Sequence, residues 1–169
     1  VSTAAAEAAA GASYGIKTNP AGAGNPVATG VLIENVTVTG TRRSALDLNG
    51  AVNTTVRNVT ASGYTGGYGL AISGDASNVT VDGFTTSENL LSWGDIAVYP
   101  YSNLAIPTGI TLTGSLNITA LTVQPAGSAL SVTVAGAANQ KYNASAQVTV
   151  PPSFNRMVSM GAGAQTTHL

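Results

Sequence analysis

The sequence contains no cysteine, which excludes disulfide bonds and thiolate metal sites. Only 8% of its 169 residues are charged, against roughly 25% in a typical soluble domain. The net charge is -1, and no basic stripe interrupts the chain. Such a chain offers no electrostatic attraction to a nucleic acid or to an anionic membrane surface, so we expect neither partner.

Histidine and long apolar runs are equally scarce. The one histidine, His168, is the penultimate residue, and chain ends are usually poorly ordered, so we do not expect histidine catalysis. No apolar run approaches the roughly 18 residues of a membrane span, and no signal peptide is recognisable, as in a mature secreted chain or a piece of a longer one. Low charge with abundant threonine, asparagine and glycine favours an extracellular or cell-surface location.

One short phrase recurs three times. It reads IENVTVTG from Ile33, VRNVTASG from Val56 and VDGFTTSE from Val81, at spacings of 23 and 25 residues. Triplets that begin and end with an apolar residue recur downstream of these phrases 24, 26 and 25 residues apart, as LDL, LAI, IAV and LTV. A period of about 20–50 residues indicates stacked repeats. Because these β-branched runs have no helical segment between them, parallel stacking predicts a solenoid with one coil per repeat.

Each phrase also holds two apolar residues three positions apart, such as Ile33 and Val36. A straight strand points such residues to opposite faces, so both face the interior only if the backbone bends between them. The second residue of each bend is Asn35, Asn58 or Gly83, types that tolerate positive φ. We therefore predict left-handed backbone at these positions and an inward asparagine ladder joining the first two.

These features resemble the right-handed parallel β-helix family, the fold of pectate lyases and many phage tailspikes. Coils of that family have three strands and one tight two-residue bend, often with stacked asparagine. The resemblance covers about residues 28–101 well and reaches weakly to 134. It implies an all-β, right-handed parallel β-helix of about three to five coils, in a short segment of a larger surface protein or filament subunit.

The chain divides into four segments by composition. Residues 1–27 are predicted to form an Ala-rich N-terminal cap and a linking loop, 28–106 the β-helix coils and 153–169 a C-terminal tail. Residues 107–152 alternate apolar and polar side chains, which fits further coils or a small β-sheet or sandwich. We favour further coils.

Two groups of charged residues are candidates for chemistry. Glu34, Arg57 and Asp82 share one predicted column, either as a carboxylate pair with an activating cation or, as we favour, as a surface salt ladder. A second group is a candidate only if the chain is an enzyme, because the resemblance implies acidic residues that hold calcium and an arginine or lysine base. This catalytic set consists of Asp47, Asp95, Arg42 and Arg43.

We predict no resident metal or cofactor, and calcium enters only under the lyase alternative. Calcium takes about six to eight oxygen ligands, and the predicted surface offers few clustered carboxylates. Asp47 lies mid-strand between apolar residues, so it should face outward with Ala71, Ala97 and Thr122 in its column.

Most of the aromatic residues gather in two adjacent coils. Aromatic faces beside Asp and Asn are a usual platform for sugars, although they also serve to cover the corners of coils. The residues predicted to bind carbohydrate or a partner are Tyr64, Tyr68, Trp93, Tyr99 and Tyr101.

Six Asn-x-Ser/Thr sequons are candidate glycosylation acceptors. Asn35 and Asn58 are set aside because the ladder is expected to hold them inside. The remaining candidates are Asn143, Asn117, Asn53 and Asn78.

These patterns favour a non-catalytic, extracellular structural or adhesive module that supports assembly or attachment through its aromatic loops. Exposed coil ends are rows of unpaired strand edges, so a homo-oligomer or filament could form end to end. The alternative is a fragment of a polysaccharide lyase or glycoside hydrolase that acts on acidic polysaccharide. A polysaccharide is a partner under either hypothesis.

Overall fold

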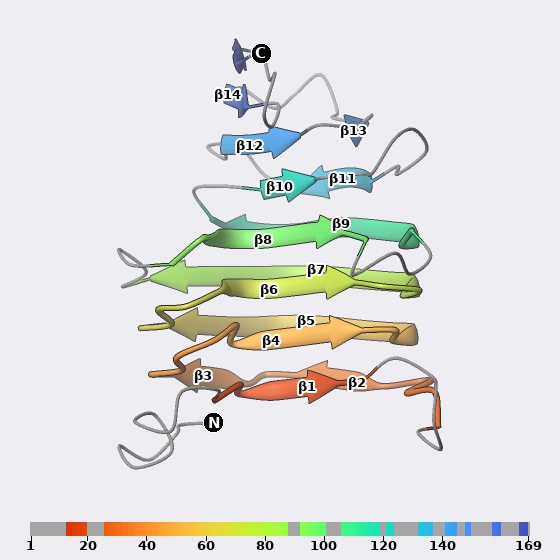
Figure 1. The fold of residues 1–169 in the computed structure, drawn as a ribbon. Helices are drawn as coiled ribbons and strands as arrows, with labels where there is room; N and C mark the ends of the chain where they lie inside the picture. Colours follow the sequence, from red (N-terminus) through yellow and green to blue (C-terminus); the bar gives the residue numbers. More distant parts are fainter. Residues whose placement is uncertain are drawn as a thin grey trace.

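Two parallel sheets wind around a single apolar core in the computed structural model (Figure 1). The structure describes residues 13–19, 26–87, 92–100, 106–118, 121–123, 132–136, 141–144, 148–149, 157–159 and 166–168. Within these residues all regular structure is β-strand and no helix occurs. The Ala-rich stretch that was predicted to cap the N-terminal end lies outside the described residues, as does most of the predicted tail.

The strands of one sheet lie in the order β1, β4, β6, β8, β10, β12, β14 and β15. Neighbours pair in parallel except for the antiparallel pair β14 and β15. Their bounds are β1 Ile16–Thr18, β4 Leu46–Asn49, β6 Tyr68–Ser73, β8 Gly94–Tyr99, β10 Leu121–Val123, β12 Lys141–Ala144, β14 Met157–Ser159 and β15 Thr166–His168.

The other sheet runs in the order β2, β5, β7, β9, β11 and β13, with β3 also pairing with β5, and all of its pairs are parallel. The bounds are β2 Leu32–Glu34, β3 Thr37–Thr39, β5 Val52–Ser62, β7 Ser77–Ser87, β9 Thr108–Asn117, β11 Val132–Gly136 and β13 Val148–Thr149.

The register of the first sheet confirms the predicted repeat. Leu46 pairs with Leu70, Leu70 with Ile96, and Ile96 with Leu121. The chain is therefore a parallel β-solenoid of about three turns. Parallel pairing continues past Pro107, because β9 pairs with β7 and β11 pairs with β9.

The predicted bends are present at Asn35, Asn58 and Gly83, whose φ angles are 54°, 49° and 84°. The bend brings Val56 and Val59 into the core together, as predicted. The asparagine ladder also forms, because the Asn58 Nδ2 group donates to Asn35 Oδ1 at 3.3 Å. The expectation that this ladder faces inward was wrong: both asparagines are exposed, because the apolar residues on either side take the interior positions.

A second asparagine ladder lies on the same sheet. Asn53 and Asn78 have φ angles of 51° and 53°, and the Asn78 Nδ2 group donates to Asn53 Oδ1 at 3.1 Å. Both side chains are exposed. The solenoid therefore carries two rows of left-handed residues, each of which sets a bend.

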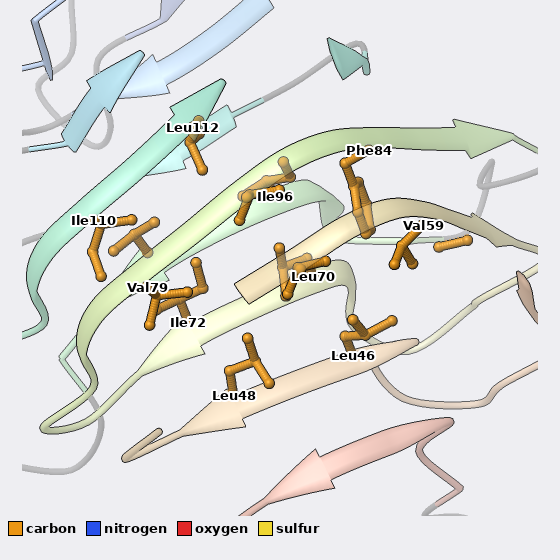
Figure 2. Close-up of a cluster of buried hydrophobic side chains, with 14 of the residues drawn as sticks. Leu46, Leu48, Val59, Leu70, Ile72, Val79, Phe84, Ile96, Ile110 and Leu112 are labelled. Carbon is orange, nitrogen blue, oxygen red and sulfur yellow. The ribbon is translucent and has the colours of Figure 1, made fainter. Parts of the chain in front are cut away.

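The core between the two sheets consists of aliphatic side chains and the rings of Phe84 and Tyr64. Figure 2 shows these side chains pointing from facing strands into a common interior. The largest fully buried apolar side chains are Phe84, Leu46, Leu48, Leu70, Ile72, Ile96, Ile110, Leu112 and Leu121. Alternate residues of β4, β6 and β8 face this core, so the residues between them form the outer face of the sheet.

Gly83 tests the requirement for a left-handed bend. We expect Gly83→Asn to keep nearly full stability, because its amide could continue the ladder to Asn58 Oδ1. The new Cβ atom would lie 3.0 Å from that oxygen, so a small shift is needed. Gly83→Val should lose at least about 1–2 kcal/mol, the usual penalty for a left-handed L-residue. Urea unfolding followed by circular dichroism measures both.

Gly30→Val provides the matched control for the conformational penalty. Gly30 has φ 66°, and an added Cβ there meets nothing within 4 Å, so this variant reports the cost of the backbone conformation without crowding. If Gly83→Asn and Gly83→Val lose equal stability, the need for a residue that tolerates positive φ does not determine which residue occupies this bend.

Candidate binding site

The predicted outward column of residues lies on the outer face of the sheet that contains β4, β6 and β8. Asp47 pairs with Ala71, Ala71 with Ala97, and Ala97 with Thr122. The structure adds Lys17, which pairs with Asp47 from β1. Because Asp47 alternates with the core residues Leu46 and Leu48, it faces outward as expected, yet it is only 8% exposed.

Asp47 lines a cavity of about 300 Å³ that lies over the outward residues of β4 and β6. Asn49, which pairs with Ser73, lies beside Asp47 on the same face. The cavity is lined by Tyr14, Lys17, Arg43, Ser44, Asp47, Asn49, Gly66, Gly67, Tyr68, Ser73, Trp93 and Tyr99.

Glycines allow the loops before β4 and β6 to stack closely at the rim. A Cβ atom added to Gly67 would lie 2.6 Å from the backbone nitrogen of Ser44, and one added to Gly66 would collide with the Arg42 carbonyl oxygen. The Tyr68 backbone N–H donates to Ser44 Oγ at 3.1 Å, and the Trp93 N–H donates to the Gly67 carbonyl at 2.9 Å. These contacts place the two aromatic residues at the cavity.

Three of the predicted aromatic residues form one cluster. The rings of Tyr68 and Trp93 meet edge to face, with centroids 5.8 Å apart and planes at 81°. The rings of Tyr68 and Tyr99 are tilted at 45° with centroids 5.9 Å apart. Trp93 is 65% exposed, one of three large apolar side chains exposed among the described residues. Tyr101 lies outside the described residues.

Tyr64 was assigned to this aromatic surface, and the structure places it elsewhere. Its side chain is fully buried in the core, where its hydroxyl donates to Asp95 Oδ1 at 2.7 Å. Asp95 is itself 0% exposed. A side chain with no accessible surface cannot contact a ligand, so Tyr64 is a core residue.

The four residues of the predicted catalytic set do not meet at one surface. Asp47 and Arg43 line the cavity, whereas Asp95 is in the interior and Arg42 is exposed outside the lining. The carboxylate pair of the enzyme alternative is therefore divided between the two faces of one sheet.

Sequence reasoning missed Tyr14 and Lys17, which lie in the segment predicted as cap and loop. The Lys17 ammonium nitrogen lies 4.4 Å from the centroid of the Tyr14 ring, and 4.0 Å from Asp47 Oδ2. These residues precede the first recognisable repeat, so no period marked them. An apolar–charged–polar run at residues 16–18 was the only local signal of a strand.

Burial controls the ionisation of the groups in the cavity. It raises the pKa of Asp47 above its usual value, and the positive charge of Lys17 partly opposes this effect. Burial, followed by the negative charge of Asp47, raises the pKa of Tyr99 to about 12, so this phenol is neutral at physiological pH. The neighbouring Ser73 hydroxyl opposes this rise in the pKa of Tyr99.

An unpartnered buried acceptor also faces the cavity. Asn49 is nearly fully buried, and its Oδ1 atom has no hydrogen-bond partner among the described residues. A buried amide oxygen without a partner is costly. The site therefore has an unsatisfied acceptor just below its surface, which a donor reaches only if the side chains around it shift.

The predicted column of Glu34, Arg57 and Asp82 forms a surface salt ladder. Arg57 Nη1 lies 3.0 Å from Glu34 Oε1, and Arg57 Nε lies 3.3 Å from Asp82 Oδ2. The hydrogen bond to Glu34 and then that to Asp82 raise the pKa of Arg57. All three side chains are exposed to solvent, so little net stabilisation is expected from them.

The sequons differ in their surroundings. The amides of Asn53 and Asn78 bond to each other in the second ladder, whereas Asn117 is exposed at the end of β9. Asn143 lies in β12, and its side chain is outside the described part of the structure. Glycosylation of these residues stays a prediction.

Comparisons with family models, curated proteins and solved structures found no match to this chain. Within the described ranges, no group of three His, Cys, Asp or Glu side chains is placed to hold a metal ion. No helix in that part of the chain is long and apolar enough to span a membrane.

Proposed function

We propose that this solenoid is a non-catalytic adhesive module that binds saccharide in the cavity over β4 and β6. The supporting observation is the cluster of Tyr68, Trp93 and Tyr99 rings beside the polar groups of Asp47 and Asn49. Ligand sites combine apolar and aromatic walls with a few placed polar groups. Saccharides match such a wall, because their C–H faces pack on rings while their hydroxyls bond to acceptors.

The regular stack supplies a rigid base for this site. Asp47, Asn49, Ser73 and Tyr99 project from paired strands. Tyr68 and Trp93 stand where the chain enters β6 and β8. Binding residues are commonly carried on loops that a rigid scaffold positions. This arrangement supports attachment of a surface protein to a glycan without any chemical step.

The alternative, a polysaccharide lyase or glycoside hydrolase, has less support from this geometry. Glycosidases generally use two carboxyl groups about 5–9.5 Å apart. Among the described residues that line the cavity, Asp47 is the one carboxylate. Turnover of any saccharide that binds would nevertheless favour this alternative over the adhesive module.

Assembly and location are further parts of the proposal. In the described residues, β1 and β2 pair with the stack on one side only, and an unpaired strand edge can add another strand. End-to-end association of copies, an extracellular location and membership in the right-handed β-helix family are the expectations that accompany the adhesive function.

A saccharide screen with aromatic variants tests the binding function. We expect the chain to bind at least one glycan on an array, and Trp93→Ala and Tyr68→Ala to weaken that binding about tenfold or more, as for aromatic hot spots. Calorimetry measures the affinities. Trp93 is the only tryptophan, so its fluorescence reports independently on the site in the Tyr68 variant.

Leu32→Ala is the matched control, because Leu32 is 58% exposed and lies in β2 of the opposite sheet. It should bind like the parent chain. Absence of glycan binding, or binding that both aromatic variants retain at full strength, would exclude this function.

A further inference from the structure

We infer that the cavity takes the terminal sugar of an acidic saccharide and that Arg43 holds its carboxylate. This inference rests on the proposed saccharide-binding function and specifies the chemical class and the part of the glycan that is bound. It follows from the charges, the unpartnered groups and the size of the cavity.

The charges that line the cavity favour an anionic ligand. Lys17 and Arg43 contribute two positive charges, against the single carboxylate of Asp47 among the described lining residues. Asp47 already lies 4.0 Å from the Lys17 ammonium group, and burial opposes its ionisation. The cavity therefore has a net positive charge that a ligand anion would complement.

Arg43 is the group in this lining that is available to an anion. Its backbone is held in place, because its N–H donates to the Ser13 carbonyl at 3.0 Å and its carbonyl accepts from Thr41 Oγ1 at 2.8 Å. Its exposed guanidinium makes no ion pair or hydrogen bond with the described residues. A guanidinium binds a carboxylate through two parallel hydrogen bonds.

The hydroxyl groups of the same sugar have partners deeper in the site. The neutral phenol of Tyr99 can donate or accept, and Asn49 Oδ1 is an acceptor without a donor that a small shift of the side chain would expose. A sugar acid carries both kinds of group on one ring: a carboxylate for the guanidinium and hydroxyls for the buried amide oxygen.

The size of the cavity favours a chain end over the interior of a polymer. About 300 Å³ lies at the lower limit of small-molecule sites, which span roughly 300–1,000 Å³, so one or two sugar rings fill it. On the β1 side, Lys17 and Tyr14 occupy the position next to Asp47. We take these two side chains to be the end of the site on this side.

Matched pairs of methyl glycosides test this inference. Methyl glucuronide, galacturonide and mannuronide are compared with methyl glucoside, galactoside and mannoside, which replace the carboxylate by a hydroxymethyl group on the same ring. Binding is measured by Trp93 fluorescence and calorimetry. We expect at least one acid to bind about tenfold or more tightly than its neutral partner, with the preference reduced by 0.5 M NaCl.

Arg43→Gln should remove the preference for the acid, and Arg42→Gln should preserve it. Arg42 is the matched control because it is the adjacent exposed arginine and does not line the cavity. Circular dichroism of both variants checks that the fold is retained.

The outcomes separate this inference from the proposed function. If neutral glycosides or array glycans bind as well as acids, the acidic specificity is wrong and saccharide binding stands. If the preference survives Arg43→Gln, Arg43 is not the anchor and the inference fails. If only long chains bind and single rings do not, the terminal position is wrong. If no saccharide binds in any format, the inference and the proposed function both fail.

Discussion

Replacing Phe84 by alanine is expected to lower the free energy of unfolding by about 3–5 kcal/mol, the usual cost of deleting a buried ring. Phe84 is 1% exposed and lies in the core between the two sheets (Figure 2). Its ring is the largest apolar side chain that β7 contributes to this core. A stack of coils cannot collapse into the resulting space without breaking the register of neighbouring turns, so little of the loss should be recovered.

Urea unfolding followed by circular dichroism measures this effect. Phe84→Leu retains most of the volume and should lose about 1–1.5 kcal/mol, the upper range for volume-conserving changes, which keeps the prediction testable if the alanine variant does not fold. Leu32→Ala removes an aliphatic side chain from the surface and should change the free energy of unfolding by less than about 0.5 kcal/mol. A loss at Phe84 no larger than that at Leu32 would mean that the ring does not support the core.

Tyr64→Phe is expected to cost about 1.5–3 kcal/mol, as for a buried hydrogen bond to an ionisable group. The substitution removes one oxygen, and with it the 2.7 Å bond to Asp95 Oδ1. Both residues have no accessible surface, so water cannot replace the lost donor. Leaving a buried acceptor without this donor costs more than the bond itself contributes.

Tyr99→Phe is the matched control, since it removes the same atom from a half-buried tyrosine at the cavity. It should lose much less stability. A double-mutant cycle with Asp95→Asn isolates the coupling energy between the two side chains. Tyr64→Phe should cost less stability in the Asp95→Asn background, because the carboxyl group is gone. If Tyr64→Phe and Tyr99→Phe lower the free energy of unfolding by equal, small amounts, the buried pair of Tyr64 and Asp95 does not stabilise the fold as proposed.

The repeat and its register could be predicted from the sequence because stacking makes equivalent residues recur at nearly constant spacing. The pairing of Leu46, Leu70, Ile96 and Leu121 follows the spacing of the apolar triplets. Asn53 and Asn78 are also 25 residues apart, so the second ladder was visible too. Both residues also belong to Asn-x-Ser/Thr sequons, which is the one role that the sequence analysis assigns to them.

The position of Asp95 could not be predicted from strand alternation. Consecutive side chains of a strand normally point to opposite faces. At the start of β8, however, Asp95 and the core residue Ile96 both face the interior. Space for the Tyr64 hydroxyl exists because residue 69 is glycine: a Cβ atom there would lie 3.1 Å from that oxygen and 2.8 Å from the Asp95 carbonyl. Such a fit depends on contacts between loops of different length, for which a single sequence contains no periodic signal.

The candidate site could be predicted only in part, because only some of its residues belong to the repeat. Tyr68, Trp93 and Tyr99 were grouped correctly because they belong to the repeating turns. Tyr14 and Lys17 come from β1, which pairs with β4 although it precedes the recognisable repeat. Their contribution to the cavity follows from tertiary pairing alone.

The direction of the hydrogen bonds between turns has a mechanical consequence for the proposed attachment to a glycan. In both sheets these bonds join one turn to the next (Figure 1), so they lie along the axis of the stack. A load that separates the two ends would peel off one rung at a time. A load across the axis would be shared by many bonds in shear, so an anchor that meets force sideways would hold far longer.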